Sequence, residues 1–377
     1  MRLLELQNES DSAQACAAAG RSVADGNLRG WAALLTAADP ALVEGLRQSG
    51  LAVLQGSRGS LALGSIAQIW LAARSLADAL ERESLRNAAQ NLMRRAANVE
   101  SPAPASAWRL PRSRLPEGRT LVMGVVNATP DSFSDGGAYD PVAQGLKLAE
   151  EGADILDVGG ESTRPNAAPV DATEERRRTE PVVRELSRRT RLPISIDTTK
   201  AAVAASALDA GAEIVNDVSG LARDPEMRRA ASGAALCLMH MRGTPADMQS
   251  RATYSDLHGE VAQELTEALE RARAAGIADD QLSLDPGLGF AKTGVQNLTL
   301  LRRLREHTQL GRPLIVGASR KSFIGAATGR PAPERLFGSV AAAVIAASNG
   351  AAVVRVHDVK ATREALAVAD AIRRSGA

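Results

Sequence analysis

Residues 194–217 read ISIDTTKAAVAASALDAGAEIVND, and this stretch decides the fold. It begins with a short apolar run that ends at Asp197, continues through an alanine-rich segment, and reaches a second apolar run at Ile214. Short apolar strands that alternate with helical segments are typical of a parallel sheet, because each helix returns the chain to the start of the next strand. The stretch therefore predicts a β–α–β unit of an α/β protein.

The same alternation recurs along the chain from residue 121 onward. Eight short apolar runs are each followed by a segment rich in Ala, Leu, Arg and Glu. The runs are Leu121–Val126, Ile155–Val158, Ile194–Asp197, Ile214–Asn216, Ala235–Met239, Leu282–Asp285, Leu314–Gly317 and Val353–Val356. Eight such units over about 250 residues match a (β/α)8 TIM barrel. An open, doubly wound sheet is the alternative fold.

A proline-rich stretch separates this region from the N-terminal one. Residues 101–118 contain four prolines, whereas Pro40 is the only proline before them. Clustered prolines are typical of a semi-rigid linker. We therefore predict a small α/β domain over 1–100, a linker over 101–118 with a boundary near residue 110, and the barrel over 119–377. Because the first region lacks histidines, paired carboxylates and a phosphate loop, we expect it to be a scaffold or an oligomerisation module.

The charge balance and the cysteine content exclude several classes of protein. There are 45 Lys and Arg against 44 Asp and Glu, which argues against nucleic acid or a membrane surface as a partner. The two cysteines, Cys16 and Cys237, form neither a disulfide framework nor a cysteine-rich zinc site. The N-terminus turns polar at once and no long apolar run occurs, so we expect no signal peptide, no membrane span and a cytoplasmic location.

Polar residues follow all eight predicted strands. In a TIM barrel the active site lies at the carboxyl ends of the strands, so these residues are candidates for one site. Hydrogen-bond acceptors end strands three, four and six at Asp197, Asn216 and Asp285, and such a set suits an amine-bearing heterocycle. The cationic and amide residues of strands seven, eight and one suit an anion such as pyrophosphate, and they are Arg320, Lys321, Arg355, His357 and Asn127. For any single Asp, a structural ion pair is the alternative.

Two glycine-rich loops accompany these residues. Residues 134–137 and 287–289 allow close backbone approach or movement, and neither forms a Walker or dinucleotide-binding loop. His240 stands alone at a strand end, where a packed core histidine is the simpler interpretation than a metal ligand.

Taken together, these motifs resemble the bacterial dihydropteroate synthases of folate biosynthesis. The matching stretches are MGVVNATPDSFSDGG, DVGGESTRP, ISIDTTK, IVNDVSG, LMHMRGTP, LDPGLGFAKT, IVGASRKSFIG and RVHDV, in unbroken order over about residues 119–375. The resemblance implies a transferase that joins 6-hydroxymethyl-7,8-dihydropterin diphosphate to 4-aminobenzoate, giving 7,8-dihydropteroate and pyrophosphate. It also implies a target of sulfonamides and a homodimer packed through the late barrel helices. Residues 1–110 resemble nothing that assigns them a role.

The resemblance carries roles to individual residues. The pterin would be held by Asp197, Asn216, Asp285 and Lys321, with Met239 packed against its ring. Pyrophosphate would be bound by Asn127, Arg355 and His357, with Asn127 also the Mg²⁺ ligand. The aminobenzoate pocket would comprise Thr163, Arg164, Pro165, Phe290, Lys321 and Ser322. Asp285, Lys321 and Asp197 would be the catalytic residues.

The mechanism implied is dissociative cleavage of the C–O bond, with Asp285 facing the developing positive charge and the arylamine attacking afterwards. One residue departs from the family pattern, because Asn166 stands where the family usually has Gly. Asn tolerates a positive φ better than most residues, so the loop geometry is expected to be kept.

Two other functions compete with this one. A methyltetrahydrofolate:corrinoid methyltransferase has a similar barrel and pterin pocket, but it needs neither the Ser-Thr-Arg-Pro stretch nor the Ser-Arg-Lys stretch. An inactive paralogue that only binds pterin is the other alternative. The presence of Asn127, Arg164 and Lys321 argues against an inactive paralogue.

Overall fold

The computed structural model describes residues 1–377 except 8, 20–27, 29, 37, 81, 130–139, 164–166 and 376–377, and gives no side-chain description of residues 9 and 10. The chain divides into two compact units. Unit 1 comprises residues 1–102 and 305–311, and unit 2 comprises residues 103–304 and 312–377.

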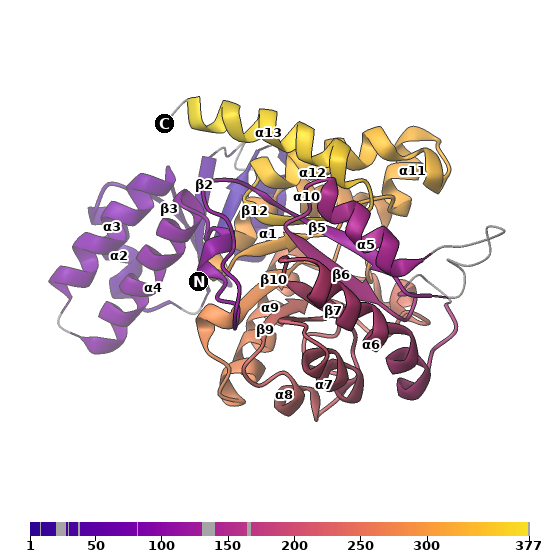
Figure 1. The fold of residues 1–377 in the computed structure, drawn as a ribbon. Helices are drawn as coiled ribbons and strands as arrows, with labels where there is room; N and C mark the ends of the chain where they lie inside the picture. The colour runs from indigo at the N-terminus through magenta and orange to yellow at the C-terminus, as the bar shows by residue number, and fades with distance from the viewer. Residues whose placement is uncertain are drawn as a thin grey trace. The chain divides into compact units, whose positions relative to one another are not determined.

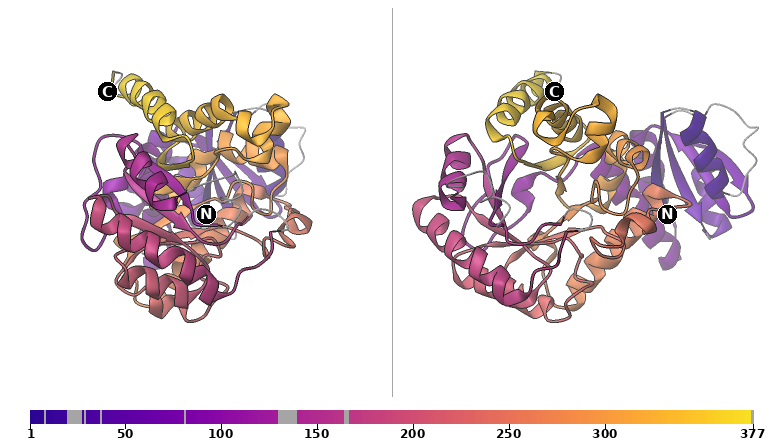
Figure 2. Two further views of the ribbon diagram at one scale, coloured as in Figure 1. Left: turned by 45° about the vertical axis from the view of Figure 1, so that its right-hand side comes forward. Right: turned by 90° about the vertical axis from the view of Figure 1, so that its right-hand side faces the viewer.

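Unit 2 is a closed barrel of parallel strands, which confirms the predicted (β/α)8 fold (Figures 1 and 2). Within the described residues its strands are β5 (Leu121–Asn127), β6 (Ile155–Gly159), β7 (Ile194–Asp197), β8 (Ile214–Asp217), β9 (Ala235–Met239), β10 (Leu282–Asp285), β11 (Leu314–Val316) and β12 (Ala351–Val356). Neighbours in sequence are neighbours in the barrel, and β12 pairs with β5 to close it. Each strand lies within two residues of its predicted position.

Helices surround these strands (Figure 1). They are α5 (Pro141–Glu150), α6 (Ala172–Arg189), α7 (Ala201–Asp209), α8 (Met227–Ala230), α9 (Leu257–Ala274), α10 (Gly294–Arg302), α11 (Ser322–Thr328), α12 (Leu336–Ser348) and α13 (Val359–Ser375). Side-chain caps fix several starts: Asp140, Asp171 and Thr293 each accept a hydrogen bond from a first-turn N–H. Among the described helices, none combines the length and the apolar character that crossing a bilayer requires.

The interior of the barrel has two layers, because side chains two positions apart on a strand face the same side. The lower layer is largely apolar, with Met123, Ile155, Ile214, Cys237 and Val353 in one buried cluster, and Ser195 and Ser283 are its buried polar members. Two positions further along, the upper layer is polar, and its members are Asp157, Asp197, Asn216, Asp285 and Arg355. The fold therefore places the charged strand ends together above an apolar floor.

Residues 103–118 belong to the barrel unit and not to a free linker. Trp108 is 1% exposed and packs with Leu110 and Leu115 into the cluster of the lower layer. Its indole N–H donates to the carbonyl of Gln281 at 2.9 Å. The apolar residues between the prolines bury this segment against the barrel. The boundary between the two units therefore falls at residue 102 and not near residue 110.

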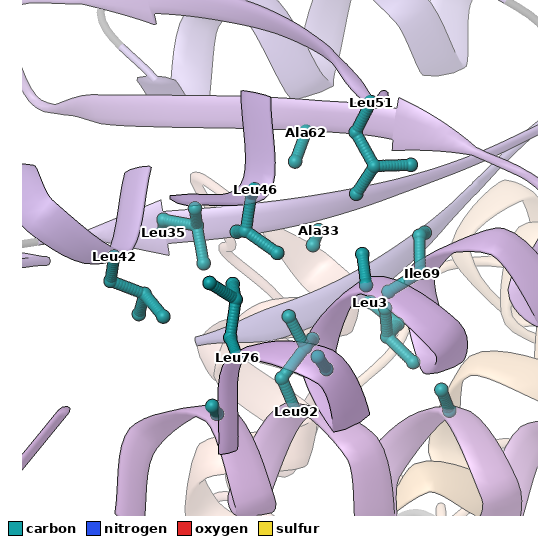
Figure 3. Packing of buried hydrophobic residues seen from close by; sticks show 14 of the residues in the cluster. Leu3, Ala33, Leu35, Leu42, Leu46, Leu51, Ala62, Ile69, Leu76 and Leu92 are labelled. Carbon is teal, nitrogen blue, oxygen red and sulfur yellow. The ribbon is translucent and has the colours of Figure 1, made fainter. Parts of the chain in front are cut away.

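Unit 1 is a four-stranded antiparallel sheet with helices on both faces. Its described elements are β1 (Arg2–Leu6), α1 (Glu9–Ala19), β2 (Gly30–Thr36), α2 (Pro40–Gln48), β3 (Ala52–Gly56), β4 (Gly59–Gly64), α3 (Ile66–Ala79) and α4 (Glu83–Glu100), with the strand order β1-β2-β4-β3. Helices α2, α3 and α4 cover one face, where Leu42, Leu76 and Leu92 meet Leu3 and Leu35 of the sheet (Figure 3). Helix α1 covers the other face through Ala15 and Cys16.

A short segment from later in the chain completes unit 1. The 3₁₀ turn η6 (Leu304–Leu310) lies in sequence between α10 and β11. The Gln309 amide accepts from the Leu3 N–H at 3.0 Å and donates to the Leu3 carbonyl at 3.2 Å. The Glu306 carboxylate accepts from the Glu5 N–H at 2.7 Å. These side chains bind the backbone of edge strand β1, which would otherwise be open to another strand.

Candidate active site

Arg355 is the centre of the buried polar layer. It is the fifth residue of β12, and its Nε donates to Asp157 Oδ2 at 2.6 Å while its Nη2 donates to Asp197 Oδ2 at 2.7 Å. One guanidinium thus joins the ends of β6, β7 and β12 across the barrel interior. Although burial alone lowers the pKa of Arg355, the carboxylates of Asp157 and Asp197 outweigh burial and raise it.

Asn216 extends this group to β8. Its Nδ2 donates to Asp157 Oδ2 at 3.3 Å, which leaves the amide oxygen of Asn216 as an acceptor. Asp157 is fully buried, and its Oδ1 has no hydrogen-bond partner among the described residues. The described hydrogen bonds use one oxygen of Asp197, so its second oxygen is available to a ligand.

Burial raises the pKa of two carboxyl groups in this layer, Asp197 and Asp285. Burial raises the pKa of Asp197 to about 7; Arg355 opposes this shift, and the nearby Asp157 carboxylate adds to it. Burial also raises the pKa of Asp285 to about 6, against the effect of the Gly287 N–H and the Lys321 ammonium. Ionising these two groups is therefore unfavourable, and it becomes easier when a ligand brings N–H donors or positive charge.

The loop after β10 brings Asp285, Phe290 and Lys321 together. Asp285 Oδ1 accepts from the Gly287 N–H at 2.7 Å, which fixes the carboxylate at the strand end. The Lys321 ammonium lies 4.1 Å from the centre of the Phe290 ring. Gly289 has a φ of +83°, and a Cβ there would come within 3.0 Å of the Lys321 side chain. Burial lowers the pKa of Lys321 to about 8.

One wall of the site is apolar. Phe290 is 7% exposed and Met239 is 5% exposed, and both pack in one cluster with Val218, Met248 and Ala291. An apolar wall beside buried acceptors suits a flat heterocycle, whose face packs on carbon and sulfur while its edge donates hydrogen bonds.

The predicted anion residues lie at the ends of β12 and β5. His357 is half-buried, and its Nδ1 lies 3.0 Å from Ser319 Oγ. Burial, together with the charges of Arg355 and Arg320, lowers the pKa of His357 to about 4, so at neutral pH this histidine offers a hydrogen bond and not a charge. Arg320 forms an ion pair with Asp358 at 2.7 Å. Asn127 ends β5 and is in register with Gly159 of β6.

The predicted aminobenzoate residues are only partly described. Thr163 is half-buried after β6, and Ser322 is exposed at the start of α11. Arg164, Pro165 and Asn166 lie outside the described residues, as does the first glycine-rich loop at residues 134–137. In the part of the chain that is described, no group of three or more His, Cys, Asp or Glu side chains could hold a metal ion.

Sequence reasoning gave Asp157 no role in the site, although it lies at its centre. Asp157 lies within the predicted strand Ile155–Val158, but it is not among the predicted site residues. The sequence did contain a signal for Asp157, namely its position along the strand. Asp157 stands two residues after Ile155, just as Asn216 stands two residues after Ile214. That alternation places both side chains inside the barrel.

Comparisons with known proteins identify the family of this chain. The family model of the pterin binding enzymes matches residues 123–357. A dihydropteroate synthase from Synechocystis sp. is 49% identical over 263 residues, covering 68% of this chain and 91% of the relative. The Yersinia pestis dihydropteroate synthase, solved with a sulfonamide drug complex, has a TM-score of 0.68 at 43% identity and covers 71% of this chain and 98% of its own. The Xanthomonas albilineans enzyme in complex with 7,8-dihydropteroate has a TM-score of 0.62 at 44% identity and covers 68% of this chain and 94% of its own.

The fold and the site define a barrel enzyme that binds a small ligand at the carboxyl ends of its strands. The chain belongs to the pterin binding enzymes and, among them, to the dihydropteroate synthases. Residues 1–102 precede the matched segment.

Proposed function

We propose that this protein condenses 6-hydroxymethyl-7,8-dihydropterin diphosphate with 4-aminobenzoate to form 7,8-dihydropteroate and pyrophosphate. The observation that carries this proposal is the buried layer of Asp157, Asp197, Asn216 and Asp285 around Arg355, beside the apolar wall of Met239 and Phe290. The relatives favour this reaction over a corrinoid methyltransferase.

The acceptors would bind the pterin. Asp197 and Asp285 each keep one oxygen outside the described hydrogen bonds, and Asn216 keeps its amide oxygen, so these residues suit the N–H groups of a pterin edge. Asp285 is buried, and burial raises its pKa to about 6. We propose that it stabilises the cation that develops at the exocyclic methylene, because an ionised carboxylate in a low-dielectric site acts strongly on a nearby positive charge.

The opposite side of the site would bind the diphosphate. Two of the guanidinium nitrogens of Arg355 bond carboxylates, which leaves Nη1 for an anion. His357 and Asn127 would add hydrogen bonds. Asn127 supplies an amide oxygen, a ligand type that suits Mg²⁺, and Mg²⁺ commonly binds through substrate phosphates with few protein ligands. We therefore propose that Asn127 would be the protein contact of a Mg²⁺ ion bound together with the diphosphate; such an ion would supply positive charge to the leaving group.

The aminobenzoate would lie between Phe290, Lys321 and the loop after β6. Lys321 lies over the Phe290 ring, so a cation stands beside an apolar ring. This pair suits an aromatic acid, whose carboxylate would meet the cation and whose ring would meet Phe290. Thr163, Arg164, Pro165 and Ser322 would complete this pocket, and sulfonamides would compete there. The amine attacks the methylene with its own lone pair, so a well-positioned arylamine needs no strong general base.

A two-substrate assay tests the proposal. Purified protein is incubated with Mg²⁺ and either substrate alone or both together, and dihydropteroate and pyrophosphate are measured. We expect both products only when both substrates are present. No dihydropteroate with both substrates present would contradict it.

We also propose a homodimer that packs through α12 and α13, in a cytoplasmic enzyme. Phe337 and Ile345 of α12 are 85% and 46% exposed, and Val368 and Ile372 of α13 are 61% and 68% exposed. These two helices contact each other, so their apolar side chains offer a surface for a second copy.

A further inference from the structure

The loop between β10 and α10, residues 286–293, is strained and needs support from outside. Gly287, Gly289 and Ala291 have φ values of +70°, +83° and +48°. Left-handed backbone at three of five successive positions is costly for Ala291 and persists only where the surroundings hold it. A Cβ at Gly287 would lie 2.0 Å from the His240 carbonyl oxygen, so the loop also packs closely against the end of β9.

Lys292 supplies this support from inside the protein. It is 2% exposed, and its ammonium donates to the carbonyls of Gly287 at 3.1 Å and Phe290 at 3.0 Å. Its third contact is His240 Nδ1 at 2.9 Å. Burial lowers the pKa of Lys292 to about 7, against the effect of the nearby Asp285 and Glu264 carboxylates. In its charged form Lys292 has three donors and no acceptor, so His240 Nδ1 then accepts and all three donors are used.

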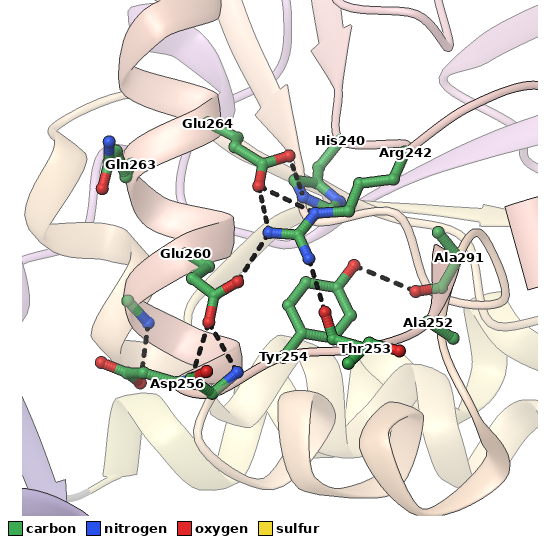
Figure 4. Close-up of polar contacts among 12 residues, drawn as sticks. His240, Arg242, Ala252, Thr253, Tyr254, Asp256, Glu260, Gln263, Glu264 and Ala291 are labelled. Carbon is green, nitrogen blue, oxygen red and sulfur yellow. Dashed lines mark hydrogen bonds and ion pairs between the residues drawn. The ribbon is translucent and has the colours of Figure 1, made fainter. Parts of the chain in front are cut away.

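His240 links this lysine to helix α9. Burial lowers the pKa of His240 to about 4, so the ring is neutral at pH 7 and carries its single proton on Nε2. Nε2 lies 3.1 Å from Glu264 Oε2. The other oxygen of Glu264 accepts from Arg242 Nε at 2.9 Å, as Figure 4 shows. The loop is thus bonded through Lys292 to His240, and the His240 ring lies next to Glu264 of helix α9.

A second support reaches the same loop from the segment before α9. Arg242 lies over the Tyr254 ring at 4.0 Å and donates to the Thr253 carbonyl at 2.7 Å. The Tyr254 hydroxyl donates to the Ala291 carbonyl at 3.0 Å (Figure 4). Both supports therefore act on the loop carbonyls that flank or belong to Phe290.

We propose that Lys292 is a positioning residue for the synthase reaction. Its ammonium holds the loop in the form that places Phe290 under Lys321 and presents the aminobenzoate subsite. The chain contains five lysines and uses arginine for nearly all its other positive charge, and Lys292 lies in a buried position where an ammonium is unfavourable without such a task. The inference rests on the proposed function, because it assigns a role within that site.

The test is Lys292→Met, which keeps the length of the side chain and removes its donors. Its matched control is Lys147→Met on α5, where the lysine side chain is 66% exposed. Initial rates are measured with each substrate varied while the other is saturating. We expect the KM for 4-aminobenzoate to rise and kcat to fall, each about tenfold. The KM for the pterin diphosphate should stay nearly unchanged, because its other ligands stand on strands.

A merely structural role would lower the amount of folded enzyme and leave both KM values unchanged. Folded Lys292→Met with wild-type KM values would therefore overturn the proposal. Should that variant not fold, Tyr254→Phe removes the hydroxyl that donates to the Ala291 carbonyl of the same loop. We then expect the KM for 4-aminobenzoate to rise about threefold. A wild-type KM in Tyr254→Phe would then overturn the proposal. Wild-type protein that makes no dihydropteroate would contradict the proposed function instead.

Discussion

The two layers inside the barrel lie on the same strands but have opposite effects on the stability of the fold. The lower layer is largely apolar and closed by Trp108, whereas the upper layer holds three aspartates and an arginine in a space of similar burial. Apolar burial stabilises the fold, and burying carboxylates destabilises it unless each is compensated. The difference teaches that on β6, β8 and β12 an apolar side chain of the core and a polar side chain of the site stand only two residues apart.

The largest effect is expected from neutralising one carboxylate of the upper layer. Asp285→Asn keeps an oxygen to accept the Gly287 N–H but removes the negative charge that faces the pterin. We expect kcat to fall about 1,000-fold, in line with the loss of one strong electrostatic contact to a transition state. The measurement is dihydropteroate formation with both substrates saturating. Turnover within the range of the wild type would show that Asp285 has no such role.

The second prediction concerns the lower layer, where a substitution should change the stability of the protein and not its activity. Trp108→Ala removes the largest fully buried side chain and its hydrogen bond to Gln281, so we expect a loss of about 4 kcal/mol in the free energy of unfolding. The kcat of the folded enzyme should not change. Denaturant unfolding measures the first quantity and the assay the second. Trp70→Ala, at a half-buried position in unit 1, is the matched control, and it should destabilise the protein less.

The smallest effect is expected at Cys237, in the lower layer just before Met239. Its thiol is fully buried, and burial raises its pKa well above the usual range, so it is expected to stay protonated and inert. Cys237→Ala should cost about 1 kcal/mol of stability through a small cavity and leave kcat and both KM values unchanged. A change in either KM would place this cysteine in the functional layer.

The barrel could be predicted from the sequence because its signal is local. Each strand is a continuous apolar run and each carboxyl end is polar, so positions such as Asp197 and Asp285 follow from the pattern alone. Asp157 was not among the predicted site residues, and the period of two along β6 is what places its side chain inside the barrel.

Features that depend on contacts distant in sequence could not be predicted. The prolines of residues 101–118 indicated a linker, whereas Trp108 among them is buried in the barrel. The pairing of Gln309 with Leu3 joins residues about 300 positions apart and leaves no periodic trace in either segment. The role of Lys292 depends on which carbonyls its ammonium meets, and only the three-dimensional structure gives these.

The central claim is that burying charged side chains in the upper layer lowers the stability of the fold. The test is how the difference in free energy of unfolding between wild type and Asp285→Asn depends on pH. Burial raises the pKa of Asp285 from an ordinary value near 4 to about 6 in the folded protein. The folded state therefore keeps a proton that the unfolded state has lost, and wild-type stability falls as the pH rises from about 4 through 6. Asn at position 285 cannot ionise, so Asp285→Asn is free of this loss, while Asp197 titrates in both proteins.

The measurement is the free energy of unfolding of wild type and Asp285→Asn between pH 4.5 and pH 8. We predict that the variant is the more stable protein at pH 8, by up to about 3 kcal/mol, and that the difference shrinks toward zero at the acid end. A variant that is less stable than the wild type at pH 8 would contradict the account.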